Sequence, residues 1–224
     1  MTPCKSYHTI LEQQTARVEE ELKRPALAFF FLVSQRRLDL GFGPLAMAIN
    51  NTSLKDVLPP PILTLLNANF YAIRFVLIVI GYSALFTAQT TSAVQPVLAR
   101  RASVGALFRL WSIVLVANLI GCFLFSAAAV VLEPALGVIE PSAFGELAHR
   151  LIGKPWWVTL MSAAAADWLM GLLSWLIAAS RETTSQIIVV WLATVVIGLS
   201  GMHHFIAGTI EILMGYFPAK VPPG

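Results

Sequence analysis

Apolar runs long enough to cross a membrane recur along this sequence, and they limit its possible folds more than any other feature. A helix needs about 20 mostly apolar residues to cross roughly 30 Å of hydrocarbon. Such runs extend over residues 25–49, 62–81, 107–132, 156–179 and 187–217. Hydrophobic residues make up 57% of the chain and charged residues 12%, a balance outside that of soluble domains. We therefore expect an all-α polytopic membrane protein.

The regions outside these runs predict the domain limits and the orientation. Residues 1–24 are polar and predict a cytoplasmic N-terminal segment, residues 25–217 a transmembrane domain of five spans, and residues 218–224 a tail. No run resembles a cleavable signal peptide. Eight Lys and Arg residues lie on the side of the N-terminus and four on the opposite side. Because positive charge accumulates in cytoplasmic loops, the N-terminus is expected in the cytoplasm.

Two of the runs lose helical character in their middle. The stretch GYSALFTAQTTSAVQPVLARR, residues 81–101, mixes glycine, threonines, glutamine and proline into what should still be membrane depth. The stretch GLSG, residues 198–201, interrupts the last run. Non-helical backbone is tolerated at that depth only where protein or a wet cavity shelters it. One interrupted helix in each half of the chain indicates a substrate path.

Charged residues also occur inside the runs. Arg36 and Asp39 are three residues apart, so a helix would place them on one face, where Asp39 can neutralise Arg36 or Arg37. Arg74 is expected to extend its side chain to the membrane surface. Glu211 follows His204 by seven residues and is interpreted as a pore-mouth charge or an interface anchor.

The stretch GMHHFIAGTIEILMG, residues 201–215, places two adjacent histidines within an apolar run. An anion at the bilayer centre costs several kcal/mol whereas its protonated acid is neutral, so a group that titrates near neutral pH can lower the barrier to permeation. The competing interpretation is a histidine that only hydrogen-bonds a neighbouring helix. A metal site is not expected, because adjacent helical residues point about 100° apart and no third ligand is evident.

Other functional classes find little support in the sequence. No nucleophile, base and orienting group assemble, and no phosphate-binding glycine loop occurs, so an enzyme is not expected. The net charge of +3 is explained by the basic ends of the spans rather than by nucleic-acid binding. Cys4 lies in a polar tail and Cys122 in an apolar span, so no disulfide is predicted. No cofactor is expected.

Several motifs, in order along the chain, resemble the formate/nitrite transporter family, and in particular its more divergent branch. ELKRPALAFF and LDLGFGPLAMA are similar to the entry into the first span of that family, and LFT at residues 85–87 is similar to its loop in the broken second helix. PVLARRASVGALFRLW with NLIG resembles the third span, DWLMGLLSWLIAA the fourth, and GMHHFIAG the motif of the broken fifth helix. The resemblance covers most of the chain.

The resemblance implies an aquaporin-like bundle of six spans with two broken helices, assembled as a homopentamer in the inner membrane with one pore in each protomer. It implies transport of small monovalent weak-acid anions such as formate, nitrite or hydrosulfide. His204 matches the central pore histidine and Thr87 the threonine that faces it. The other residues that the resemblance places on the substrate path are Leu85 and Phe86 at the cytoplasmic constriction, Tyr71 and Phe75 at the outer constriction, Gly171, Ser174 and Gly208, with Lys154 as a vestibule charge.

The sequence departs from the family pattern at several positions. His203 stands where the family usually has glutamate, and Gly208 and Gly171 stand where it usually has asparagine. Arg36 and Arg37 replace small or apolar residues, and the chain shows five spans where the family has six. These departures leave open a second interpretation, a non-conducting membrane scaffold or assembly protein of the same fold. Thr87 could equally well be a residue that satisfies its own helix backbone, and without the motif match Leu85, Phe86, Tyr71 and Phe75 would be interpreted as ordinary lipid-facing or core residues.

Overall fold

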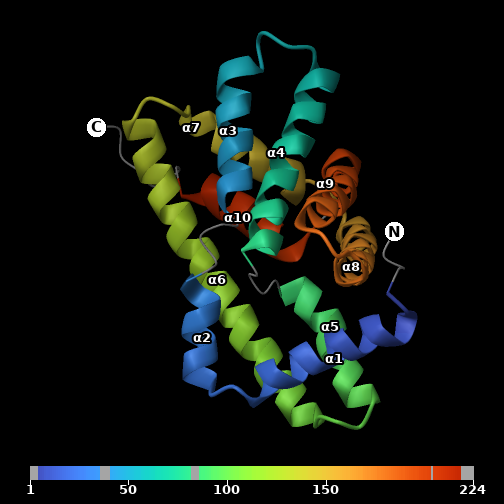
Figure 1. Cartoon of the computed structure of the whole chain (residues 1–224). Helices are drawn as coiled ribbons and strands as arrows, with labels where there is room; N and C mark the ends of the chain where they lie inside the picture. The colour runs from blue at the N-terminus through green and yellow to red at the C-terminus, as the bar shows by residue number, and fades with distance from the viewer. Residues whose placement is uncertain (1–4, 36–40, 82–85, 203, 218–224) are drawn as a thin grey trace.

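The computed structural model describes residues 5–35, 41–81, 86–202 and 204–217, and within these ranges the side chains of residues 31–35 and 86–89 are not described (Figure 1). The described chain is α-helical, as expected. Its helices are α1 (Tyr7–Lys23), α2 (Ala26–Gln35), α3 (Phe42–Leu54), α4 (Pro60–Ile80), α5 (Phe86–Leu98), α6 (Val104–Ala135), α7 (Pro141–Ile152), α8 (Trp156–Ala179), α9 (Thr183–Ser200) and α10 (Phe205–Tyr216).

Four of these helices, namely α4, α6, α8 and α9, are long and apolar enough to cross a membrane. The predicted bounds of the fourth span, residues 156–179, coincide with those of α8. The third span is longer than predicted, because α6 extends over 32 residues and includes Pro134 in its last turn. The number of spans in the whole chain stays a prediction.

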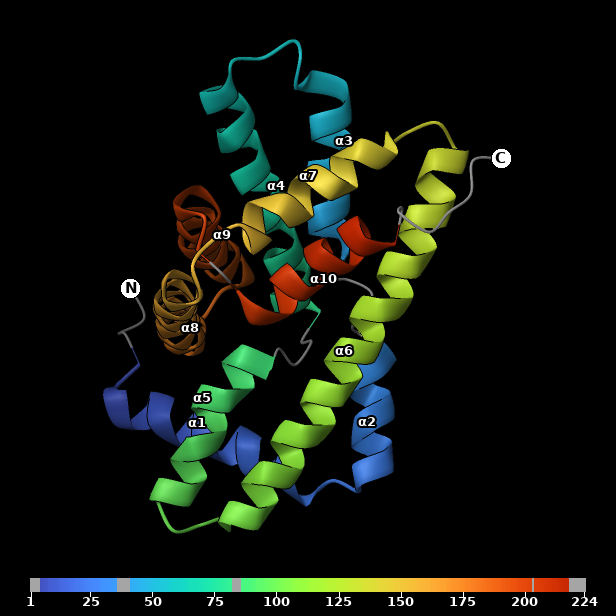
Figure 2. The same cartoon turned by 180° about the vertical axis from the view of Figure 1, so that it is seen from behind.

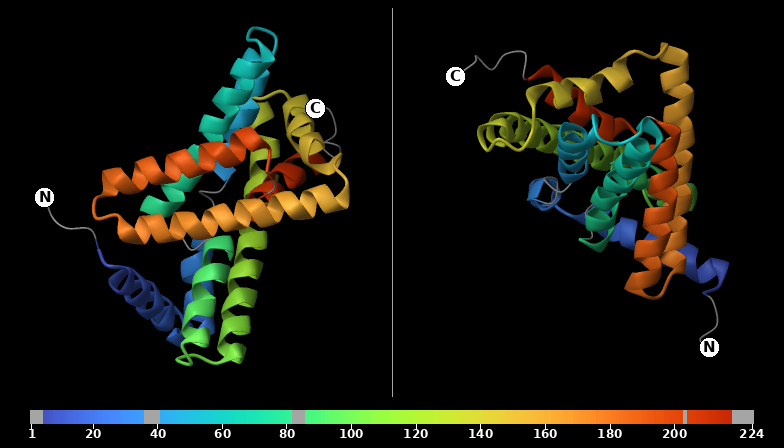
Figure 3. Two further views of the ribbon diagram at one scale, coloured as in Figure 1. Left: turned by 90° about the vertical axis from the view of Figure 1, so that its right-hand side faces the viewer. Right: turned by 90° about the horizontal axis from the view of Figure 1, so that it is seen from above.

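The helices form two groups that cross each other (Figures 1 and 3). Helices α8 and α9 run side by side in opposite directions, and they lie steeply across α3, α4, α5 and α6. Helix α4 packs against α9 and α3, and α10 packs against α6 and α7. The buried side chains of α3, α4, α6, α7, α8, α9 and α10 join in one hydrophobic cluster. The two broken helices therefore meet inside the core.

The second predicted interruption is present, whereas most of the first lies outside the described residues. Helix α4 ends at Ile80 with Gly81 as its C-cap, and α5 is described from Phe86. Helix α9 ends at Gly201, whose φ of 60° is left-handed and whose N–H group bonds back to Gly198 and Ile197. Only glycine adopts this conformation at little cost, so the GLSG stretch ends the helix as the sequence indicates. The half-helices α5 and α10 both begin near the middle of the molecule and contact each other (Figure 2).

Two polar regions contain helices that the search for apolar runs did not identify. The loop after the third span contains α7, whose buried face is formed by Ala143, Phe144, Leu147 and Ala148. Residues 1–24, expected as a polar lead-in, contain α1, which packs on α5, α6 and α8 through Ile10, Thr15, Val18 and Leu22. Both helices are amphipathic and lack the length of a span, so a search for long apolar runs misses them.

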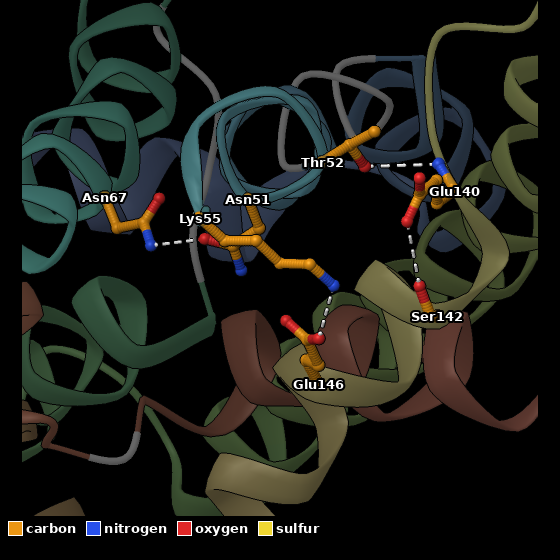
Figure 4. A network of polar contacts seen from close by, with 7 residues as sticks. All are labelled: Asn51, Thr52, Lys55, Asn67, Glu140, Ser142 and Glu146. Carbon is orange, nitrogen blue, oxygen red and sulfur yellow. Dashed lines mark hydrogen bonds and ion pairs between the residues drawn. The ribbon is translucent and has the colours of Figure 1, made fainter. Parts of the chain in front are cut away.

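The first predicted span, residues 25–49, also differs. The described part contains two helices, α2 and α3, and α3 continues through Asn50 and Asn51 to Leu54, where a polar connection had been expected. Asn67 of α4 donates to Asn51 Oδ1 at 2.8 Å (Figure 4). It also accepts from Asn50 Nδ2 at 2.8 Å. These bonds link the three buried amides, and they help the helix to extend past two asparagines. Arg36, Arg37 and Asp39 lie outside the described residues.

Candidate functional site

His204 lies at the break between α9 and α10. It is the N-cap residue of α10, with extended backbone dihedral angles (φ −101°, ψ 121°), and its ring Nδ1 accepts a hydrogen bond from the Ala207 N–H at 3.4 Å. Its side chain is buried, with the residue 2% exposed. Because Nδ1 is an acceptor, the neutral ring must carry its proton on Nε2. His204 is thus held in one tautomer by the first turn of α10.

Phe75 of α4 packs against His204, and Tyr71 of the same helix packs against Phe75. The Phe75 ring meets the His204 ring edge-on, with centroids 5.3 Å apart and an interplanar angle of 73°. The Tyr71 ring lies 5.3 Å from Phe75. Tyr71 and Phe75 are four residues apart, so one face of α4 presents both rings. The structure therefore brings together three of the residues expected on the substrate path, His204, Phe75 and Tyr71.

Arg74 is the main correction to the predicted site. The sequence predicted a side chain that extends to the membrane surface, but Arg74 is 0% exposed. Its Nη1 lies 3.6 Å from Glu211 Oε1 of α10, and its guanidinium carbon lies 3.6 Å from the centre of the Tyr71 ring. Glu211 is therefore a buried partner of Arg74 rather than a pore-mouth charge. Opposite charges in two different spans are the signal that could have indicated this pair.

Gly43 of α3 makes room for this arginine. A methyl group at position 43 would lie 2.9 Å from Arg74 Cδ and 3.1 Å from its Cβ and Cγ. The close approach of α3 to α4 at this point therefore depends on glycine. The sequence pattern GFG at residues 41–43 did not by itself reveal this role.

Helix α6 supports the start of α10 through two short side chains. Cys122 Sγ lies 3.8 Å from the Ile206 carbonyl oxygen, and Ser126 Oγ donates to the Ile210 carbonyl oxygen at 3.4 Å. Both residues are fully buried. Cys122 therefore acts in packing, and its weak contact holds the first turn of α10, and with it His204, against α6.

The remaining predicted residues occupy different positions around this cluster. Gly208 is buried in α10, and its N–H bonds to the His204 carbonyl oxygen at 2.8 Å. Gly171 of α8 faces Thr91 of α5, since an added methyl group would lie 3.4 Å from Thr91 Cγ2. Ser174 Oγ donates to the Met170 carbonyl oxygen of its own helix at 3.0 Å. Gly171 and Ser174 therefore lie at the contact of α8 with neighbouring helices, and Ser174 satisfies its hydroxyl locally.

Lys154 acts on the end of a helix in this structure. Its Nζ donates to the Gly201 carbonyl oxygen at 2.8 Å. A cation at this position complements the negative end of the α9 dipole. Lys154 thus stabilises the interruption in the last span, three residues before His204.

Part of the predicted site lies outside what the structure describes. Leu85 and His203 are outside the described residues, while Phe86 and Thr87 lie in the first turn of α5 with their side chains not described. Thr87 is four residues before Thr91, so the two positions share one face of α5. Within the described ranges, no group of three or more His, Cys, Asp or Glu side chains is arranged to hold a metal ion.

Comparisons with known proteins extend these observations. A family model for formate/nitrite transporters matches residues 8–222. Among curated proteins, Inner membrane protein YfdC of Escherichia coli (strain K12) is 29% identical over 197 residues, which cover 87% of this chain and 62% of that protein. A Probable formate transporter of Methanothermobacter thermautotrophicus is 27% identical over 190 residues, which cover 78% of this chain and 69% of that protein. The chain spans about three fifths of the length of the first of these relatives.

Solved structures share the fold. An "FNT family ion channel" has a TM-score of 0.79 at 19% identity, covering 93% of this chain and 83% of that chain. A "Pentameric formate channel with formate bound" has a TM-score of 0.71 at 20% identity, covering 85% of this chain and 74% of that chain. The expected fold, a helical bundle of this type with interrupted helices, is therefore confirmed.

Proposed function

Because this chain belongs to the formate/nitrite transporter family, we propose that it is a membrane channel or transporter for small monovalent weak-acid anions such as formate or nitrite, with His204 on the path. The family match places it among transporters rather than enzymes. The observation that best supports the proposed path is the position of His204. A polar ring lies at the break of a membrane helix, in a buried cluster, where its Nδ1 bond to Ala207 orients it.

The chemistry of the site suits a small anion. An unpaired anion in hydrocarbon is costly, and hydrogen bonds from fixed donors reduce that cost. The neutral His204 ring supplies an N–H group at Nε2. The start of α10 adds the partial positive charge of a helix N-terminus, and α5 begins nearby.

The N-cap bond favours hydrogen bonding over proton transfer by His204 itself. A protonated ring would carry hydrogen on both nitrogens, and Nδ1–H would then face the Ala207 N–H instead of accepting from it. The neutral ring can polarise an anion that takes a proton from elsewhere along its path. Uptake is then expected to rise as the pH falls, because the protonated acid becomes more abundant.

The packing of Phe75 against His204 suggests where the path is narrow. Phe75 is 0% exposed and lies against His204, so an ion reaches the ring only after Phe75 or another neighbouring side chain moves. We propose Phe75 and Tyr71 as one constriction and Leu85 and Phe86 as the other, with Thr87, Gly171, Ser174 and Gly208 along the path. Lys154 is proposed to attract anions in addition to its bond with Gly201.

The proposal includes location and assembly. The related E. coli protein is named an inner membrane protein, and one solved relative is named a pentameric formate channel. Together with four apolar helices of spanning length, these names support a multi-pass protein of the inner membrane that assembles as a homopentamer in the lipid bilayer. Lys and Arg residues are more frequent on the side of the N-terminus than on the opposite side, and this supports a cytoplasmic N-terminus. Nucleic acid is not among the proposed partners.

One observation favours the second candidate, a non-conducting scaffold of the same fold. Arg74, Phe75 and His204 are all nearly or fully buried and packed together. If these side chains do not move, they block the path beside His204. The measurement of ion flux distinguishes this candidate from the proposed transporter.

The test is uptake of radiolabelled formate and nitrite into proteoliposomes at two pH values. His204→Asn keeps an N-cap residue, because asparagine also accepts from the backbone there, but it removes the imidazole. We expect the initial rate to fall about tenfold or more, since a hydrogen bond to a charged group contributes about 1.5–3 kcal/mol. The exposed His149 of α7, changed to asparagine, serves as the control and should keep its rate.

Two outcomes would overturn parts of the proposal. The scaffold would be favoured if the unchanged protein takes up neither anion faster than protein-free liposomes do at either pH value. Unaltered pH-dependent uptake by the His204→Asn protein would remove His204 from the path.

A further inference from the structure

Arg74 is a charged side chain that the proposed mechanism does not use, and it lies beside the proposed path. Arg74 is near the middle of α4 and is 0% exposed. Its guanidinium carbon lies 3.6 Å from the centre of the Tyr71 ring and 5.0 Å from the centre of the Phe75 ring. Because Phe75 also contacts His204, a single ring touches both the arginine and the histidine. Arg74 therefore adjoins the site around His204.

The hydrogen-bonding capacity of this arginine is not filled. Its Nε, Nη1 and Nη2 atoms are buried and have no hydrogen-bond partner among the described residues, and the same is true of the Tyr71 hydroxyl group. Glu211 Oε1 lies 3.6 Å from Nη1, which is ion-pair distance but longer than a hydrogen bond. A buried guanidinium without acceptors is costly. The N–H groups of Arg74 can therefore donate hydrogen bonds to a further acceptor.

We infer that Arg74 and Tyr71 bind the transported anion directly. In the absence of the anion, the Glu211 carboxylate pairs with Arg74, and an arriving anion competes with it. The inference rests on the proposed function and names two side chains that bind the anion.

The shape of the guanidinium group suits the anions of the proposed function. Its planar fork of N–H donors matches two oxygens on one atom in a bidentate pair, whereas chloride or hydrosulfide presents a single acceptor atom. The present partner of Arg74, a carboxylate, belongs to the same chemical class as formate. Arginine also keeps its charge at all physiological pH values, so this part of the site binds anions whatever the state of His204.

The first experiment measures anion binding to the purified protein in detergent by isothermal titration calorimetry with sodium formate, sodium nitrite and sodium chloride. The key variant is Glu211→Gln, which removes the competing carboxylate charge and keeps Arg74. If Arg74 binds the anion, the affinity for formate should increase about tenfold, because the anion no longer displaces a charged partner. If the pair is only structural, this variant should bind formate no more tightly than the unchanged protein.

The matched control is a second ion pair, which contains neither Arg74 nor Glu211. Lys55 Nζ lies 3.1 Å from Glu146 Oε1, between α3 and α7 (Figure 4). The hydrogen bond to Glu146 and its negative charge raise the pKa of Lys55 above its usual value. Glu146→Gln removes a carboxylate charge from an ion pair as Glu211→Gln does, and it should leave formate affinity unchanged.

A second variant tests the inference without leaving an unpaired charge buried in the protein. In the double variant Arg74→Met and Glu211→Met, both charges are replaced by apolar side chains, which is often tolerated in a buried ion pair. Formate and nitrite affinity should fall about tenfold or more while chloride affinity changes little.

The outcomes separate this inference from the proposed function. Unchanged formate affinity in Glu211→Gln, or equal affinity of the unchanged protein for formate and chloride, would overturn the inference even if proteoliposome uptake persists. Binding that depends on Arg74 in a protein without flux would support the inference and contradict transport. If the double variant does not fold, the sign of the change in Glu211→Gln decides the inference by itself.

Discussion

At the scale of single residues, one bond sets the chemistry of His204. The Ala207 N–H occupies Nδ1, so the neutral ring presents hydrogen only at Nε2. The sequence identified the histidine through its place beside GLSG and through its family motif. It could not identify the tautomer, because that depends on the histidine being an N-cap rather than an interior helical residue.

Phe75 is the residue whose removal should most change access to His204. Phe75→Ala removes a fully buried ring that touches the imidazole. We expect formate uptake to increase several-fold while the free energy of unfolding falls by about 3 kcal/mol, as for other buried large-to-small changes. Uptake into proteoliposomes and unfolding by denaturant in detergent measure the two effects.

Phe144 provides the control for that change. It is also 0% exposed, but it lies in α7, where its carbonyl oxygen approaches Gly215 at the far end of α10 from His204. Phe144→Ala should lower stability by a similar amount without faster uptake. Equal effects of the two variants on uptake would mean that Phe75 does not control access.

The position of Arg74 was not predictable from its neighbours in the sequence. An arginine in an apolar helix usually extends toward the interface, and this expectation was wrong here. Its burial depends on Glu211 from α10 and on the space that Gly43 leaves in α3. Three segments distant in the sequence therefore determine the conformation of one side chain.

At the scale of elements, the sequence predicted the interruption at GLSG and did not identify the two amphipathic helices. Glycine, threonine and proline within apolar runs directly indicate a broken helix. Helices α1 and α7 have 17 and 12 residues, and their buried residues recur along one face. The spacing of Ala143, Phe144, Leu147 and Ala148, just after Pro141, was the signal that would have predicted α7.

The end of α9 supplies a prediction about the interruption itself. Gly201→Ala places a side chain on a left-handed backbone with φ of 60°, which should lower the free energy of unfolding by about 1 kcal/mol. The control is Gly153→Ala at the end of α7, where φ is −75° and an added methyl group would meet only ordinary contacts. Unfolding of both variants by denaturant measures the difference in their free energies of unfolding. Equal values would show that the left-handed conformation of Gly201 does not contribute to stability.

At the scale of the whole molecule, the order of spans was predictable but their arrangement was not. Hydropathy locates α4, α6, α8 and α9 because each is a single apolar segment. The crossing of the α8–α9 hairpin over α4 and α5 results from packing between segments far apart in the sequence (Figure 3). That crossing brings the break before α10 next to Phe75 and Arg74.

The central claim is that a small anion enters the buried cluster around His204. A high-resolution structure of the protein with saturating formate tests it most directly. The account predicts formate density within hydrogen-bonding distance of His204 or Arg74, with Phe75 displaced from its present contact. Formate found only at the protein surface, with the Phe75 and His204 rings still packed together, would contradict it.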